Sequence, residues 1–307
     1  MTIAYRVLGI VVAGVAAGAS LPAVAQTPPG VRRTVYITAA DSAGAYVADI
    51  AAGDLTVKED GKDRTILRVE PSDARLKISF AIDEGLTPDD TFRRAAYAFI
   101  ERLQGSADVA LYLVGSATTK IVDYTSNPLS FRQPLNGLPH RTQGGGNLVE
   151  SLYRIAQDQR GIEGRRVVVI LTTEIPQRSS MTASGVLDEL RDTGAVLHAA
   201  TLVGPAGTID PPTPESAHLE TMDEIERDRL LNEGPKQSGG LRLSLLRMEA
   251  FPGALDRIRG ELSHEYAVTY AMPAGSRSDG RVSIGTRRRG VTVRGPRQLP
   301  RIDVIKR

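Results

Sequence analysis

The sequence contains no cysteine and no tryptophan, and only 5% of its residues are aromatic. The lack of cysteine excludes disulfide bonds, thiol nucleophiles, cysteine-ligated zinc and a lipid-modified cysteine. The shortage of aromatic residues means that Val, Ile, Leu and Ala must build the core. With 307 residues, the chain is long enough for one large domain and a smaller one.

An excess of one charge is also lacking, because 38 Lys and Arg face 36 Asp and Glu. This balance argues against a main role in binding nucleic acid. The C-terminal stretch from Arg277 to Arg307 is nevertheless basic around Arg287, Arg288 and Arg289. One interpretation is a solvated hairpin whose arginines discourage pairing with other strands. The other is attachment to an anionic envelope polymer or membrane surface, which salt would weaken.

Long apolar runs are absent except near the N-terminus, where Val7 to Leu21 follows Arg6 and precedes Ala23-Val24-Ala25. This layout is typical of a secretory signal peptide with cleavage after Ala25. An uncleaved membrane anchor is the alternative, but the run is shorter than the roughly 20 residues that span a bilayer. We expect a signal peptide over residues 1–25, a linker over 26–33, and an exported protein that is periplasmic or secreted.

The stretch from Leu76 to Thr87 predicts a buried strand that stops at an acidic turn, at Asp83. Further apolar runs at residues 107–114, 166–172 and 195–203 predict strands, and segments with helical spacing alternate with them. This order predicts an α/β fold, a doubly wound, Rossmann-like and mostly parallel sheet. In such a sheet, ligands bind beyond the carboxyl ends of the strands, where Asp83 would lie.

The remaining segments divide the chain further. We expect a small N-terminal β segment over residues 34–72, the main domain over 73–272, and a basic β hairpin and tail over 273–307. Composition rich in Pro, Glu and Asp predicts a long surface loop over 204–240, with one short helical piece near Asp223 to Leu231. The strands at 281–287 and 291–294 are expected to pair with each other as the hairpin.

The order of elements and the sequences at the strand ends resemble the von Willebrand factor type A domain. More narrowly, the chain resembles exported bacterial proteins called von Willebrand factor A-related. The phrase DLTVKEDGK at Asp54 to Lys62 and the closing segment from Ala254 to Arg297 carry this narrower resemblance. The resemblance implies a non-catalytic module that binds another protein.

The resemblance also implies a metal-ion-dependent adhesion site, in which three loops offer oxygen ligands to Mg²⁺ or a similar cation. The first loop of that site, D-x-S-x-S, reads Asp83-Glu84-Gly85-Leu86-Thr87 here, so Asp83 and Thr87 remain. Gly146 stands where the second loop has Thr, and Thr173 stands where the third has Asp. Asp83, Thr87 and Glu174 could still form a weak site for Mg²⁺ or another divalent cation. The alternative is that these loops keep the geometry of the fold, with Asp83 capping the next helix, and have lost the metal.

Catalysis is not expected. The sequence has no G-x-S-x-G elbow, and no Ser/His/Asp set can be placed on one face. Of the four histidines, His198 lies in an apolar strand as a core residue, and His140 lies beside the glycine run. That run opens a helix but lacks the lysine of a phosphate-binding loop. A hydrolase that uses Asp83, Glu84 and Glu174 as acid and base stays open as an alternative.

The sequence therefore predicts an exported binding module that is metal-independent or weakly metal-dependent, with no other cofactor. A structural envelope protein that engages partners through its β segment and basic tail is a further alternative. The predicted binding face is formed by Asp83, Glu84, Gly85, Thr87, Gly144, Gly145, Gly146, Asn147, Thr173 and Glu174.

Overall fold

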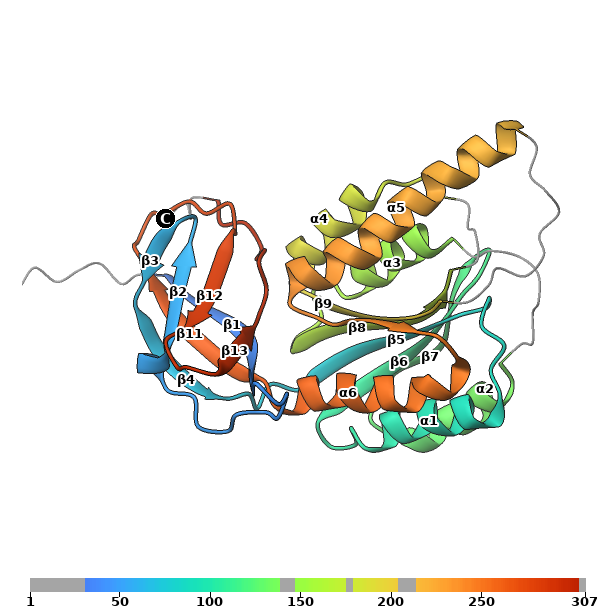
Figure 1. Cartoon of the computed structure of the whole chain (residues 1–307), viewed down its shortest axis with the longest axis horizontal. Helices are drawn as coiled ribbons and strands as arrows, with labels where there is room; N and C mark the ends of the chain where they lie inside the picture. The colour runs from blue at the N-terminus through green and yellow to red at the C-terminus, as the bar shows by residue number, and fades with distance from the viewer. Residues whose placement is uncertain (1–30, 139–146, 175–178, 204–213, 304–307) are drawn as a thin grey trace, which may run out of the picture.

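The structure is a computed structural model that describes residues 31–138, 147–174, 179–203 and 214–303, with the backbone alone for 214–221. Two domains lie side by side (Figure 1). The α/β domain holds residues 74–264, and the β domain combines residues 31–71 with 266–303. The α/β fold class with a mostly parallel sheet is confirmed.

The sheet of the α/β domain has six strands in the order β10-β9-β8-β5-β6-β7. Neighbouring strands are parallel except β6 and β7, which are antiparallel. In chain order this is the doubly wound arrangement 3-2-1-4-5-6, whose order reverses between β5 and β8. The strands are β5 (Leu76–Asp83), β6 (Ala107–Val114), β7 (Thr118–Thr125), β8 (Arg165–Thr173), β9 (Val196–Leu202) and β10 (Arg242–Leu245).

Helices cover both faces of this sheet (Figure 1). One layer contains α1 (Asp90–Glu101), η2 (Pro128–Phe131), α2 (Arg132–Asn136), η3 (Met248–Ala250) and α6 (Phe251–Ser263). The other layer contains α3 (Leu148–Asp158), α4 (Ala183–Thr193) and α5 (Pro214–Ser238). Because both faces are covered, β5 and β8 are buried along nearly their whole length, with apolar residues predominating in their middle.

Local sequence sets the ends of these helices. Asp89 precedes α1, and its carboxylate accepts a hydrogen bond from the backbone N–H of Phe92 at 2.7 Å. Gly194 ends α4 in the left-handed conformation, with φ +67°, which glycine adopts without steric cost. In the first helical layer, Phe80 stacks on Phe99, and Phe92 meets Phe251 edge to face.

The β domain interleaves the two ends of the chain. One sheet has the order β13-β1-β11-β4 and the other β12-β2-β3, and their apolar faces share one core. Its elements are β1 (Val31–Asp41), η1 (Ala52–Asp54), β2 (Leu55–Glu59), β3 (Lys62–Arg64), β4 (Ile66–Pro71), β11 (Tyr266–Met272), β12 (Val282–Thr286) and β13 (Val291–Arg294). A hairpin turn at Asp60-Gly61 joins β2 and β3.

Two expectations about the C-terminal half differ from the structure. β12 and β13 do not pair with each other, because β12 pairs with β2 and β13 pairs with β1. β11, which was expected to belong to the domain spanning 73–272, pairs with β1 and β4 in the β domain. Each strand finds its partner in the N-terminal segment, so the pairing depends on long-range packing that a local pattern does not encode.

The expected surface loop over 204–240 also differs, because α5 spans 25 residues of it. The buried residues of α5 are few and mixed in type, namely Arg227, Leu230, Leu231, Gly234 and Pro235. A face with one arginine, one glycine and one proline among its inward positions does not give the apolar repeat by which an amphipathic helix is recognised.

The predicted signal peptide, residues 1–25, lies outside the described residues. Within the part of the chain that the structure describes, no helix combines the length and the hydrophobicity needed to cross a membrane.

Candidate functional site at the carboxyl edge of the sheet

Asp83 lies where β5 ends, at the point where the strand order reverses. Only 1% of its surface is exposed. Its Oδ2 accepts a hydrogen bond from Thr172 Oγ1 at 2.5 Å, and its Oδ1 accepts one from the backbone N–H of Gly85 at 2.9 Å. The carboxylate therefore ties the loop after β5 to the end of β8, and Asp89, not Asp83, caps the next helix.

Glu84 follows Asp83 and lies against the end of β6. Its backbone N–H donates to the carbonyl of Val114 at 2.7 Å. Its carboxylate lies over Gly115 so closely that a Cβ at this glycine would collide with Oε2. Gly115 in turn accepts a hydrogen bond from the backbone N–H of Asn147 at 2.9 Å. Glu84 and Asn147, predicted from separate loops, are therefore brought together through Gly115.

The end of β8 meets α5. Thr173 is 5% exposed, and Glu174 is half-buried. The carbonyl oxygen of Glu174 accepts a hydrogen bond from Nη1 of Arg227 at 3.0 Å, and Arg227 is itself 5% exposed. The guanidinium of Arg227 therefore supplies a buried positive charge beside the loop that was expected to offer acidic ligands.

The remaining predicted residues are less closely engaged. Gly85 is half-buried, and Thr87 is exposed. Gly144, Gly145 and Gly146 lie outside the described residues, as does His140. Asn147 begins α3, but its side chain does not cap the helix and instead donates to the carbonyl of Ser116 at 3.4 Å.

The described side chains do not fit a metal ion at this edge. Among the residues that the structure describes, no group of three or more His, Asp or Glu could hold a cation. Both oxygens of Asp83 already accept hydrogen bonds from the chain. Mg²⁺ needs several oxygen ligands in near-octahedral geometry, and Asp83, expected to bind it together with Thr87 and Glu174, already uses both oxygens within the chain.

Three residues of this edge were not found by sequence reasoning. Thr172 follows the aliphatic run of β8 from Val167 to Leu171, and its hydroxyl was the available signal, since a buried hydroxyl needs a partner. Gly115 stood in a turn of small residues, and nothing in the sequence linked it to Glu84. Arg227 lay in the short helical piece expected within the surface loop, where an arginine is ordinarily solvated.

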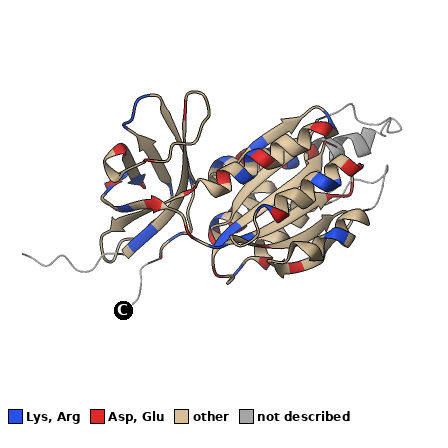
Figure 2. Cartoon of the chain, turned by 90° about the horizontal axis from the view of Figure 1, so that it is seen from below, with Lys and Arg blue, Asp and Glu red and all other residues tan. Residues whose placement is uncertain are grey.

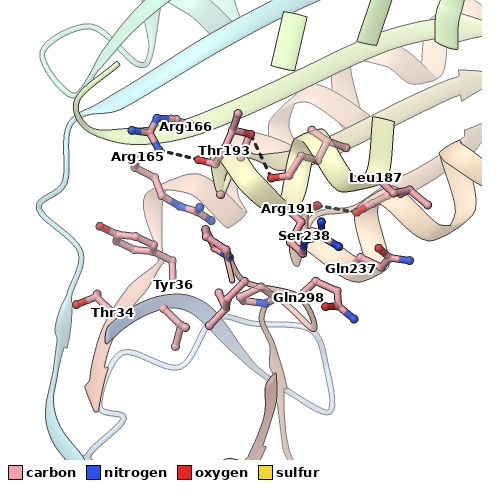
Figure 3. A pocket seen from close by; sticks show the side chains of 18 of the residues that line it. Thr34, Tyr36, Arg165, Arg166, Leu187, Arg191, Thr193, Gln237, Ser238 and Gln298 are labelled. Atoms are coloured by element: carbon pink, nitrogen blue, oxygen red, sulfur yellow. Dashed lines mark hydrogen bonds between the residues drawn. The ribbon is translucent and has the colours of Figure 1, made fainter. Parts of the chain in front are cut away.

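A second candidate is a cavity of about 200 Å³ between the two domains, at the opposite edge of the sheet (Figure 3). The side chain of Arg165 enters it and stacks on the ring of Tyr36 at 4.5 Å from the guanidinium carbon. Two nitrogens of Arg165 donate to the carboxylate of Glu265 at 3.0 and 3.2 Å. Arg166 donates to the carbonyls of Ile162 and Thr193 at 2.8 and 2.6 Å.

Arg165 is committed to joining the domains, whereas Arg166 binds within the α/β domain. Arg165 begins β8, Tyr36 belongs to β1, and Glu265 lies between α6 and β11. Arg166 binds the last carbonyls of α4, where a cation offsets the negative end of the helix dipole. Burial raises the pKa of Tyr36, so its hydroxyl stays protonated. We interpret this cavity as part of the domain junction.

His198 is the core residue that its apolar strand predicted. It is 2% exposed, and its Nδ1 accepts a hydrogen bond from the backbone N–H of Leu241 at 3.2 Å. Burial, with smaller contributions from the charges of Arg165 and Arg294, lowers its pKa to about 3. The imidazole is therefore neutral in the folded protein.

Comparison with known proteins gives structural neighbours only. An aerotolerance-related membrane protein from Bacteroides fragilis is 12% identical, with 61% of this chain and 99% of that chain covered and a TM-score of 0.41. BatB from Bacteroides thetaiotaomicron is 13% identical, with 60% of this chain and 98% of that chain covered and a TM-score of 0.37. Proximal thread matrix protein 1 from the mussel byssus is 12% identical, with 65% of this chain covered and a TM-score of 0.45. The match covers 49% of that protein, which is about half of its length.

One structure of the byssus protein has a zinc-occupied MIDAS motif. No protein-family model and no curated protein matches the sequence. At this level of identity the likeness concerns the fold alone.

Proposed function

We propose that this protein is an exported, non-catalytic binding module of the von Willebrand factor A type, which recognises another protein at the carboxyl edge of its sheet without a bound cation. The edge is the place where an open α/β sheet offers its loops to a ligand. The observation that carries the proposal is the state of Asp83, whose two oxygens are satisfied by Thr172 and Gly85.

Recognition then depends on the groups that remain accessible at this edge. Glu84, Gly85, Asn147 and Glu174 are half-buried, and Thr87 is exposed. Hydrogen bonds hold the loop that carries Glu84 at Val114 and the loop that carries Asn147 at Gly115. A partner would therefore meet a preformed surface, which lowers the entropy lost on binding.

The alternative of a hydrolase has less support. A general acid or base must reach the proton that it transfers, whereas Asp83 is almost completely buried and both of its oxygens are engaged.

Attachment of the basic tail to an anionic polymer also has less support. Arg288 forms an ion pair with Asp49 at 2.7 Å, and Arg287 donates to the carbonyls of Gly53 and Leu55. Arg289 is exposed. The internal partners of Arg287 and Arg288 favour a role for these arginines in holding the β domain together.

Capture of partners by the immobilised protein from an extract of the producing cells, with EDTA present, tests the proposal. The variant Glu84→Arg with Thr87→Arg should lose the captured protein. A matched control, Glu101→Arg with Gln104→Arg, makes the same change in charge near the other end of α1, where both positions are exposed. The control should capture as the wild type does. Equal capture by both variants, or capture only with added Mg²⁺, would refute the proposal.

A further inference from the structure

A groove runs between α1 and α2, which lie beside each other (Figure 1). It has a volume of about 400 Å³. We name it the α1–α2 groove and define it by its lining residues, which are Asp90, Arg93, Arg94, Tyr97, Arg132, Leu135 and Asn136. Figure 2 views the side of the α/β domain that these helices cover and shows Lys and Arg on it. The groove lies on the helices and shares no residue with the predicted binding face.

Positive charge exceeds negative charge in the α1–α2 groove, because it holds three arginines and one aspartate. Arg93 pairs with Asp90 at 3.3 Å. Among the described residues, Arg94 and Arg132 have no carboxylate partner, and both are exposed. Arg94 donates only to the hydroxyl of Thr91, at 3.2 Å. Two guanidinium groups therefore stand uncompensated in one groove.

Arg132 is held in position by Tyr97. Its guanidinium carbon lies 5.2 Å from the centre of the tyrosine ring, and its Nε donates to the tyrosine hydroxyl at 3.2 Å. Among the described residues, Nη1 and Nη2 of Arg132 have no hydrogen-bond acceptor. Two parallel N–H groups of this kind match the two oxygens of a carboxylate. Because the side chain is already ordered, little rotamer entropy is lost when a ligand binds.

Exposed apolar surface stands near these charges in the chain. Leu135 lines the groove but is only 1% exposed, so Leu129 supplies this surface. Leu129 is 59% exposed and stands three residues before Arg132, in the 3₁₀ turn that leads into α2. A ligand that covers both would need acidic groups for the arginines and an apolar group for Leu129.

We infer that the α1–α2 groove binds an acidic segment of a partner protein, with carboxylates on Arg94 and Arg132 and an apolar side chain on Leu129. Two uncompensated cations in a short groove do not form the extended track that a long polyanion needs. A peptide can supply both acidic and apolar side chains within a few residues.

Fluorescence anisotropy with a labelled peptide of alternating Glu and Leu tests this inference, using the chain without residues 1–25. The peptide should bind saturably, and binding should weaken as salt rises. The variant Arg94→Gln with Arg132→Gln should raise the Kd at least tenfold, which is about 1.4 kcal/mol. A peptide with Gln in place of Glu should not bind.

The matched control is Arg242→Gln with Arg289→Gln, which removes the same charge from two exposed positions outside the groove. This control should keep the wild-type Kd for the peptide. Glu84→Arg with Thr87→Arg, at the carboxyl edge, should also keep it. The second variant therefore distinguishes failure of this inference from failure of the proposed function. Equal losses in the groove variant and the arginine control would overturn the inference. Tighter, groove-dependent binding of a sulfated oligosaccharide would overturn it in favour of a polymer ligand.

Discussion

Thr172 and Thr201 form a natural pair for comparison, because they face each other in the register of β8 and β9 and both are buried. The hydroxyl of Thr172 donates to Asp83, whereas Thr201 Oγ1 has no hydrogen-bond partner. A buried polar group is stabilising when it is paired and costly when it is not. The contribution of the Asp83 contact can therefore be measured against an internal reference.

Thr172→Val removes the donor to Asp83 and leaves a buried carboxylate oxygen less well satisfied. We expect the free energy of unfolding to fall by about 1–3 kcal/mol, measured by urea denaturation. Thr201→Val should be neutral or stabilising. Equal losses in the two variants would mean that the hydrogen bond to Asp83 does not hold the carboxyl edge together.

His198 gives the protein a specific sensitivity to acid. Its pKa is lowered from 6.5 to about 3 by burial, so the unfolded chain binds a proton that the folded chain does not. Its contribution to stability is complete above pH 6.5 and is lost as the pH falls toward 3. Between pH 7 and pH 5 this loss is about 2 kcal/mol.

His198→Asn should remove most of the stability change between pH 7 and pH 5, as followed by denaturation at each pH. Carboxylates titrate mainly below pH 5, outside this range. Asp108 does so as well, because its hydrogen bond to Arg75 is the main cause that lowers its pKa. An unchanged pH dependence in the variant would show that His198 is protonated in the folded state.

At the scale of elements, the central strands and their order were predictable because their apolar patterns are local. The strand from Leu76 to Asp83 is buried on both faces, and the mostly apolar sequence of this segment is the local pattern that predicts such a strand. Only the piece of α5 near Asp223 to Leu231 was predicted, because Arg227 and Gly234 stand at inward positions where an apolar repeat is expected. The pairing of β12 with β2 is set by contacts between distant segments, which no local pattern reports.

Two glycines test the packing of α5. A Cβ at Gly234 would lie 2.7 Å from Leu197 Cδ2, whereas a Cβ at Gly253, in α6, would meet nothing within 4 Å. Gly234→Ala should therefore destabilise the protein by about 1–3 kcal/mol through overpacking. Gly253→Ala should stabilise it by about 0.5–1 kcal/mol, since alanine is the better helix former. Stability is followed by thermal unfolding. If Gly234→Ala leaves the stability unchanged, this segment behaves as a surface loop and not as a packed helix.

At the scale of the whole molecule, the β domain closes the chain on itself. β1, near one end, lies between β11 and β13, near the other. The buried pair of Arg165 and Glu265, with side-chain exposures of 8% and 7%, lies at the junction with the α/β domain. Tyr36 stacks on Arg165 from β1, so three separate segments meet at one guanidinium. The sequence did not reveal this junction, because its members are far apart in the chain.

Arg165→Ala leaves the carboxylate of Glu265 buried without its cation. We expect a loss of about 3–5 kcal/mol in the free energy of unfolding. The double variant Arg165→Met with Glu265→Leu should be less destabilised than the single one. Arg102→Ala breaks an exposed pair with Asp256 and should cost less than about 1 kcal/mol. If the Arg165 and Arg102 variants lost the same stability, the junction would not depend on the buried pair.

Isothermal titration of the chain without residues 1–25 with Mg²⁺, Mn²⁺ and Ca²⁺, alongside Asp83→Ala, tests the central claim that the carboxyl edge acts without a cation. Because Thr172 and Gly85 satisfy Asp83, we predict no saturable heat up to millimolar metal for either protein. Saturable binding to the wild type that disappears in Asp83→Ala would contradict the account and restore the metal-dependent adhesion site.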